Sequence, residues 1–186
     1  MSSSIMTDYK YQLVNRKLGL WLFILSESMV FVAVIFTRFY MQGTYKPEEL
    51  SQTLGLIITV VLLISSFTAN RAEVHISRGN LKGFLRNLSV TLILGLFFLV
   101  AVVAVEWPEV VKFAPPSTGY GTVFFALTGL HAFHVLTGLI VLLVVFFQAR
   151  RGKYSAEDYW GAQGGIIYWH FVDVVWVFVY SALYLV

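Results

Sequence analysis

The stretch Tyr168-Trp169-His170-Phe171-Val172-Asp173-Val174-Val175-Trp176 places a histidine and a carboxylate inside an apolar segment that runs to Val186. Ionisable groups in a membrane span cost about 2.5–3.5 kcal/mol each on translocon scales, so they persist where protein, lipid headgroups or water pair them. His170 and Asp173 are three positions apart and share one face of a helix. The stretch therefore predicts a membrane helix with a polar stripe.

The composition extends this prediction to the whole chain of 186 residues, of which 58% are hydrophobic and 12% charged, with a mean hydropathy of +0.76. Soluble domains carry about 25% charged residues, so an ordinary soluble fold is excluded. The chain has no cysteine, which excludes disulfides, iron–sulfur clusters and thiolate metal sites. We expect an all-α integral membrane protein that forms a single domain over residues 1–186.

Five apolar stretches are long enough for helices that cross a bilayer core of about 30 Å. They cover approximately residues 18–40, 54–71, 88–105, 120–147 and 164–186. Helices are expected because an isolated segment in lipid must satisfy its own backbone hydrogen bonds. The sequence thus predicts a bundle of five transmembrane helices.

The basic residues predict the orientation of the bundle. Ten of the thirteen fall in segments on one side of the membrane, whereas Arg38, Lys46 and Lys112 fall on the other. By the positive-inside rule, this asymmetry places the N-terminus in the cytoplasm and the C-terminus outside. The segment from Met1 to Lys17 is polar and lacks the features of a signal peptide, so we expect the first span to remain in the mature protein.

A carboxylate lies near the middle of the first span, at Glu27. Apolar surroundings favour the neutral acid, which can exchange a proton or donate a fixed hydrogen bond. A purely structural role is the alternative, since a protonated glutamate can also bridge two helices.

Two histidines of the fourth span, His131 and His134, are three positions apart and are predicted to point to the same side. Two histidines alone make a poor transition-metal site, and no carboxylate or thiolate lies nearby on this helix. The predicted depth of His170 in the membrane differs from that of His131 and His134, which disfavours a haem held between the fourth and fifth spans. The predicted depth of Glu27 is closer to that of the two histidines. We therefore expect a hydrogen bond between Glu27 and this pair, because each would satisfy the other's buried polar group.

Three motifs resemble subunit III of the haem-copper respiratory oxidases: the stretch 168–176 with Trp169, Asp173 and Trp176, the run 127–135 with both histidines, and residues 19–27. The resemblance implies a short, five-helix bacterial form. It implies that the histidine pair is internal and binds no metal. It also implies bound phospholipid, with contacts from the residues Gly19, Arg150, His170 and Phe171.

The chain departs from the family pattern at two places. Where relatives often place a headgroup-binding arginine after two phenylalanines, this chain has Gln148, with Arg150 two positions later. After the third span only the half-motif Glu106-Trp107 remains. The departure at residue 148 leaves open which arginine meets an anionic headgroup.

The functional prediction is a cofactor-free, non-catalytic subunit of a proton-pumping oxidase in a bacterial plasma membrane. Four histidines are too few for the haems and copper of a catalytic subunit, and the absence of cysteine excludes the dinuclear-copper subunit. The resemblance implies partners of both kinds, subunit I and subunit II, that carry haems and copper. Two alternatives stay open: the subunit-III-like accessory protein of nitric oxide reductase, and a small proton-coupled transporter. The electron donor, cytochrome c or quinol, is decided on other subunits.

Overall fold

The computed structural model describes residues 2–186, with side chains described from Tyr11 onward. Within that range the chain forms helices and turns and no strand. The helices are α1 (Ser2–Gln42), α2 (Gln52–Ser77), α3 (Leu81–Val100), α4 (Trp107–Phe113), α5 (Gly119–Arg150) and α6 (Trp160–Tyr180). Two π-helical segments, η1 (Ala101–Glu106) and η2 (Ser181–Leu185), continue α3 and α6.

Five of the helical stretches are long and apolar enough to cross a membrane, as the sequence predicts. Their bounds are wider than expected: Tyr11–Gln42, Gln52–Ser77, Leu81–Phe113, Gly119–Arg150 and Trp160–Leu185. The third span is longer because α3, η1 and α4 run on as one helical stretch through Glu106, which the hydropathy pattern assigns to a loop.

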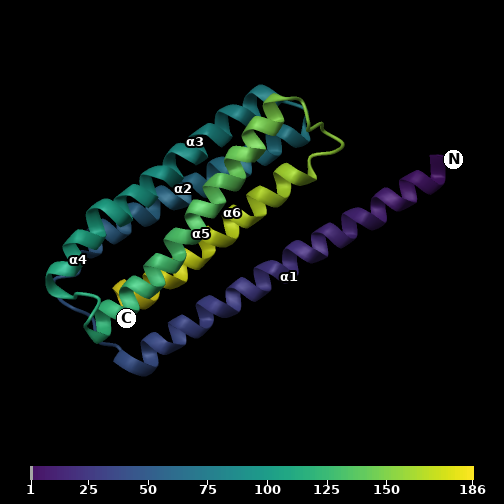
Figure 1. Cartoon of the computed structure of the whole chain (residues 1–186). Coiled ribbons are helices and arrows are strands. Elements are labelled where there is room, and N and C mark those ends of the chain that lie inside the picture. Colours follow the sequence, from purple (N-terminus) through teal and green to yellow (C-terminus); the bar gives the residue numbers. More distant parts are fainter. Residues whose placement is uncertain (1) are drawn as a thin grey trace.

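Local capping explains where several helices begin. The side chains of Ser51, Asn80 and Thr118 accept hydrogen bonds from the backbone N–H groups of Leu54, Gly83 and Gly121, at 3.3, 2.9 and 3.1 Å. These short polar side chains satisfy amide groups that would otherwise lack a partner at a helix N-terminus. The connections are short, so neighbouring helices run antiparallel (Figure 1).

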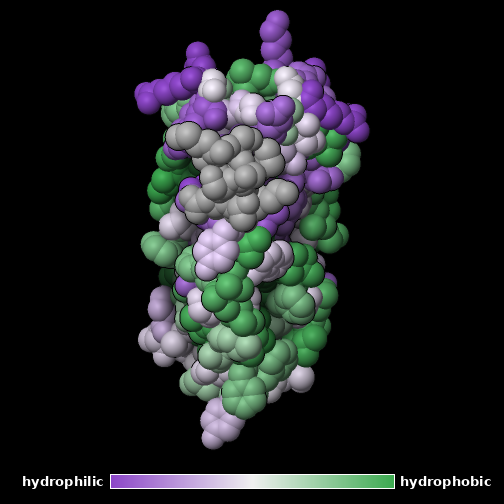
Figure 2. Space-filling view, turned by 90° about the vertical axis from the view of Figure 1, so that its right-hand side faces the viewer, coloured by the Kyte–Doolittle hydropathy of each residue, from purple (hydrophilic) through white to green (hydrophobic). Residues whose placement is uncertain are grey.

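Helices α2, α3, α5 and α6 lie side by side, and α1 lies against α5 and α6 but diverges from them toward its N-terminal end (Figure 1). Of the five spans, the one formed by α6 and η2 has the largest share of buried residues in its most apolar stretch, 67%, and the span in α1 has the smallest, 11%. Large apolar side chains cover the outside of the bundle. Figure 2 shows these apolar side chains below a hydrophilic rim. The rim belongs to the end of the molecule at the upper right of Figure 1. This inside-out distribution is typical of a protein surrounded by lipid.

Two glycines allow α3 and α5 to approach α6 closely. A Cβ atom at Gly95 would lie 2.5 Å from the Trp169 ring, and one at Gly138 would lie 2.9 Å from it. Small residues serve this purpose in membrane bundles, where close backbone approach gives van der Waals packing. Trp169 is fully buried between these two helices.

Candidate functional site

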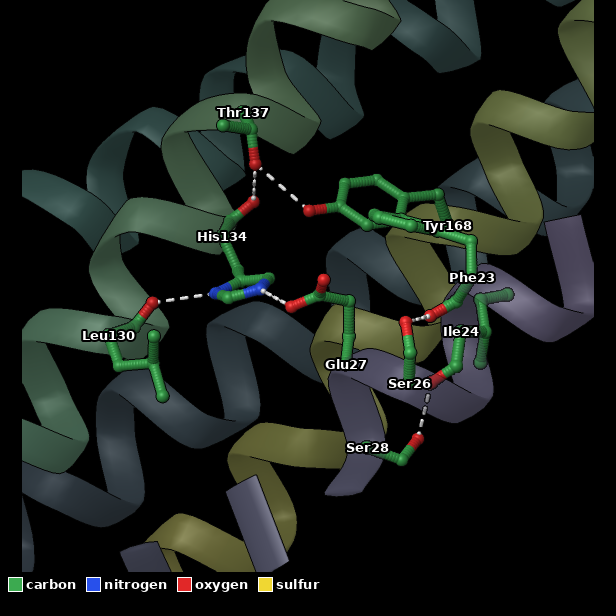
Figure 3. Close-up of polar contacts among 9 residues, drawn as sticks. All are labelled: Phe23, Ile24, Ser26, Glu27, Ser28, Leu130, His134, Thr137 and Tyr168. Atoms are coloured by element: carbon green, nitrogen blue, oxygen red, sulfur yellow. Dashed lines mark hydrogen bonds and ion pairs between the residues drawn. The ribbon is translucent and has the colours of Figure 1, made fainter. Parts of the chain in front are cut away.

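The contact expected between the first and fourth spans is present at His134. Its Nε2 atom lies 3.1 Å from Oε2 of Glu27, and its Nδ1 atom lies 2.7 Å from the backbone oxygen of Leu130 (Figure 3). The imidazole is buried, whereas the Glu27 side chain keeps 26% of its surface exposed. Glu27 is therefore only partly buried within this chain.

The two hydrogen bonds of His134 fix the number of protons between it and Glu27. A carbonyl oxygen can only accept, so Nδ1 must carry the hydrogen that points to Leu130. In a neutral imidazole Nε2 is then an acceptor, and Glu27 must supply the proton; if both nitrogens are protonated, Glu27 is a carboxylate. Either way one proton lies between the two side chains, and it can belong to either of them.

A cavity of 580 Å³ opens beside this pair, between α1 and the α5–α6 pair. Tyr168 lines it and hydrogen-bonds to Thr137 at 2.9 Å, also visible in Figure 3. The remaining walls are mostly apolar and include Leu20, Phe23, Leu130, Phe133 and Val141. The shared proton thus faces a cavity suited to an apolar or amphiphilic occupant.

His131 has different surroundings from His134. It is 1% exposed, and its ring lies 4.9 Å from that of Trp176 and 5.7 Å from that of Phe98. Among the described residues neither of its ring nitrogens has a hydrogen-bond partner. The expected bond from Glu27 to the pair therefore reaches only His134.

The aromatic and imidazole groups of α6 bind a row of hydroxyl groups on α2. Trp169 donates to Ser65 at 3.1 Å and Trp176 donates to Thr59 at 2.9 Å, while His170 Nδ1 lies 2.7 Å from Ser66 Oγ. The Trp169 side chain is fully buried inside the bundle. These indole N–H groups are satisfied inside the protein rather than at the lipid headgroups.

Asp173 is 3% exposed, and neither carboxylate oxygen has a hydrogen-bond partner within the part of the chain described. Ser66 is a polar neighbour of this carboxyl. His170 and Asp173 therefore both face the hydroxyl row of α2, which explains their shared spacing on α6.

The residues expected to hold a phospholipid are not all brought together. Arg150 is exposed at the last residue of α5. His170 lies about ten residues into α6, which begins at Trp160, and this corresponds to roughly 15 Å along the helix axis. Gly19 is exposed on α1, and Phe171 lines a separate cavity of 410 Å³. His170 therefore lies deeper in the bundle than Arg150, and a shared lipid contact of the two residues stays a prediction.

A cavity at the same end as Arg150 carries more polar side chains. It measures 410 Å³ and is lined by Arg16, Lys153 and Tyr154, with aliphatic walls from α5. The Tyr154 hydroxyl donates to Gln148 Oε1 at 2.5 Å, and burial raises the pKa of this tyrosine above its usual value. Lys17 lies nearby, with its Nζ 5.5 Å from the centre of the Trp160 ring. The carboxylate of Asp158 also lines this cavity, which therefore combines two cations and one acidic group with apolar walls.

Sequence reasoning missed a second polar cluster at the opposite end of the bundle. Arg38 is fully buried, and its guanidinium donates to the carbonyl oxygens of Gly43, Tyr45 and Val186. Glu106 is also buried and accepts a hydrogen bond from Tyr184. The sequence pattern places Arg38 near the end of the first span and Glu106 in a loop. A signal for their burial is the aromatic residue that follows each of them, Phe39 and Trp107.

Five helical spans, apolar on the outside and linked inside by indole–hydroxyl contacts and one acid–histidine pair, define a multi-pass membrane protein. Residues 6–186 match the family model described as "Cytochrome c oxidase subunit III". The chain belongs to the cytochrome c oxidase subunit III family.

Curated relatives agree with this membership. The chain is 36% identical over 179 residues to "Cytochrome c oxidase subunit 3" of Podospora anserina, covering 90% of this chain and 66% of that protein. It is 33% identical to the protein of that name from Corynebacterium diphtheriae, covering 87% and 84%. It is 31% identical to the protein of that name from Thermostichus vulcanus, and the match covers 91% of this chain and 87% of that protein. The chain thus spans about two thirds of the fungal relative and most of the two bacterial ones.

Proposed function

We propose that this protein is the non-catalytic subunit III of a proton-pumping haem-copper oxidase, which reduces oxygen to water in a bacterial plasma membrane. The observation that carries the proposal is the family match over residues 6–186. The haems and copper reside on partner subunits I and II, and this chain holds none of its own. It packs against the catalytic subunit and prolongs the working life of the enzyme.

The Glu27–His134 pair supports a role in proton supply. The two atoms that share the proton, His134 Nε2 and Glu27 Oε2, are 3.1 Å apart. Both side chains border the cavity between α1 and the α5–α6 pair. A side-chain pair that can hold a proton on either partner can pass that proton between α1 and α5 without any redox group. His131, which lies next to Phe31 and the buried Trp176, shapes the pocket of His134 rather than sharing its proton.

Co-purification tests the proposed function. A tagged copy of this chain, extracted from its native membrane in mild detergent, should elute with polypeptides that show haem bands and contain copper. The purified complex should consume oxygen. A chain that elutes alone and transports a solute in vesicles would support the proton-coupled transporter instead, and a complex that reduces nitric oxide but not oxygen would support the accessory protein of nitric oxide reductase.

A second part of the proposal concerns a bound anionic phospholipid. Arg16 and Lys153 line the cavity beside Arg150, and Val141 lines both this cavity and the one beside Glu27. A headgroup phosphate at the two cations would therefore place an acyl chain along α5 toward Thr137. Basic side chains near an interface attract anionic headgroups by about 1 kcal/mol each. This arrangement adds Arg16 and Lys153 as headgroup contacts at the end of the bundle where Arg150 lies.

Native mass spectrometry tests the lipid proposal. The double variant Arg16→Gln/Lys153→Gln should lose most of the co-purifying anionic phospholipid. The matched control Lys82→Gln/Arg86→Gln removes the same charge from exposed positions of α3 and should retain it. Equal lipid content in the two double variants would exclude the proposed headgroup site.

A further inference from the structure

Glu106 has an unusual environment at the junction of η1 and α4. Its residue surface is 3% exposed, and Oε1 accepts a hydrogen bond from Tyr184 of η2. Oε2 is buried and has no hydrogen-bond partner among the described residues. A buried carboxyl oxygen without a partner carries a desolvation cost that a further donor would offset.

The cavity beside Glu106 is acidic. It measures 240 Å³ and lies between the start of α2 and α4. Its charged lining residues are Glu49, Glu106, Glu109 and Lys112. Lys112 is already paired with Glu109 at 2.6 Å, so the carboxylates of Glu49 and Glu106 have no paired cation in the described part of the chain.

The cations nearest to this end of the bundle are also engaged elsewhere. Lys46 donates to the backbone oxygen of Tyr184 at 3.0 Å, and Arg38 donates to three carbonyl oxygens. Within the described residues, neither cation therefore forms an ion pair with Glu49 or Glu106 of the cavity.

We propose that the cavity between α2 and α4 receives a basic side chain, an arginine, from a neighbouring subunit of the complex. The guanidinium would donate to the unpartnered Oε2 of Glu106 and to Glu49 at the mouth of the cavity. This inference rests on the proposed function, because it requires that the chain has neighbouring subunits. It assigns a specific anchoring point on the face of the bundle opposite the N-terminus.

The spacing of the acidic groups favours a guanidinium over an inorganic cation. Within the residues described, no three histidine, cysteine or acidic side chains converge closely enough to hold a metal ion. A guanidinium carries five N–H donors in a planar fork and can bridge acceptors that are too far apart to ligate one ion. A buried, charge-assisted pair of this kind affects mainly the rate of dissociation.

The variant Glu106→Gln tests the proposal in the intact complex. Glutamine keeps an oxygen that can accept from Tyr184 but replaces the unpartnered oxygen with an NH₂ donor, which would repel a guanidinium. Dilution of the purified complex into detergent should release the variant subunit at least about tenfold faster than the wild type. The matched control Glu157→Gln, at an exposed carboxylate in the connection between α5 and α6 at the other end of the bundle, should change the release rate less than about twofold.

A charge reversal at the mouth of the cavity gives an independent measurement. Glu49→Lys should slow reassociation of the subunit at low salt by at least about tenfold, and the difference should shrink at high salt. Equal release rates for Glu106→Gln and the wild type would overturn the proposal and indicate that the carboxyl binds only a proton. Release of the wild-type subunit by EDTA alone would overturn it in favour of a metal ion. A wild-type chain without co-purifying partners would instead refute the proposed function.

Discussion

Glu27 and His134 illustrate how two hydrogen bonds constrain the chemistry of one residue pair. The carbonyl of Leu130 accepts the Nδ1 hydrogen of His134, so the contact between Nε2 and Glu27 holds one proton, whichever side chain carries it. Replacing Glu27 with glutamine keeps a donor toward Nε2 and abolishes the transfer. This substitution therefore separates the structural role of the contact from its role with protons.

We predict that Glu27→Gln leaves initial oxygen reduction by the complex within about twofold of the wild type, because the proposed function assigns oxygen chemistry to another subunit. The variant should lose carbodiimide labelling at residue 27, show altered proton uptake and inactivate after fewer turnovers. The control Glu157→Gln makes the same change at an exposed loop position and should behave as the wild type. Loss of initial turnover at unchanged haem content would place Glu27 in the catalytic path and refute its supporting role.

A second prediction concerns the close approach at Gly95. A Cβ atom there would lie 2.5 and 2.8 Å from two Trp169 ring atoms, and this buried indole has little room to move. We expect Gly95→Ala to destabilise the bundle by about 1–3 kcal/mol through overpacking. Gly129→Ala is the matched control on α5, since nothing lies within 4 Å of its Cβ position. Equal thermal stability of the two variants would contradict the packing role of Gly95.

At the scale of the helices, the sequence predicts the elements well and their facing sides only in part. Hydropathy reports the length of a span, so the five helices could be predicted. The similar depths of Glu27 and His134 along their helices could be predicted as well. It does not report which side of a helix meets a neighbour. Burial of Trp169 and of Arg38 depends on contacts with Ser65 and Val186, which are 104 and 148 positions away in the chain, and no local pattern encodes such contacts.

The π-helical segments were also beyond sequence reasoning. The segment η1 lies inside the third span, between α3 and α4, whereas η2 ends the fifth span, and the hydrogen bond from Tyr184 to Glu106 joins them. A π-helical turn widens the backbone locally and is often found at functional sites. The contact between Tyr184 and Glu106 joins residues 78 positions apart, so residues Ala101–Glu106 alone do not predict it.

The connection between α5 and α6 gives a prediction on pH dependence. Burial raises the pKa of Tyr154, so the folded loop disfavours the phenolate. An unfolded tyrosine titrates near its ordinary value of 10.0, so the contribution of Tyr154 to stability is present below that pH and is lost as the pH rises above it. Subtracting the tyrosinate titration of a Tyr154→Phe variant from that of the wild type should reveal a midpoint above 10.0. A midpoint at or below this value would show that the tyrosine is solvated.

At the scale of the whole molecule, the distribution of charge predicts an orientation that can be measured. Ten basic residues in segments on one side and three on the other predict a cytoplasmic N-terminus. Reporter domains inserted at Gly79 should be active in the cytoplasm, and those inserted at Ser117 or fused after Val186 should be active outside. The reverse pattern of activities would contradict the predicted orientation.

We further predict that the isolated subunit shows no haem Soret band and binds neither iron nor copper stoichiometrically. His134 is occupied by Leu130 and Glu27, His170 lies next to Ser66, and His131 is enclosed by aromatic rings. Elemental analysis of the purified chain measures this directly, with the co-purified complex as the positive control. One tightly bound transition metal per chain would contradict the prediction.

The central position of α6 has a consequence for biosynthesis. This helix leaves the ribosome after the other four spans, yet its side chains fill the space beside Gly95 and Gly138 and satisfy the hydroxyl groups of Thr59 and Ser65. Until α6 is inserted, the other helices lack these contacts, and the surfaces that α6 later covers remain exposed to lipid. A nascent chain arrested before Trp160 should therefore be a good substrate for membrane proteases, and resistance to them should arise in one late step.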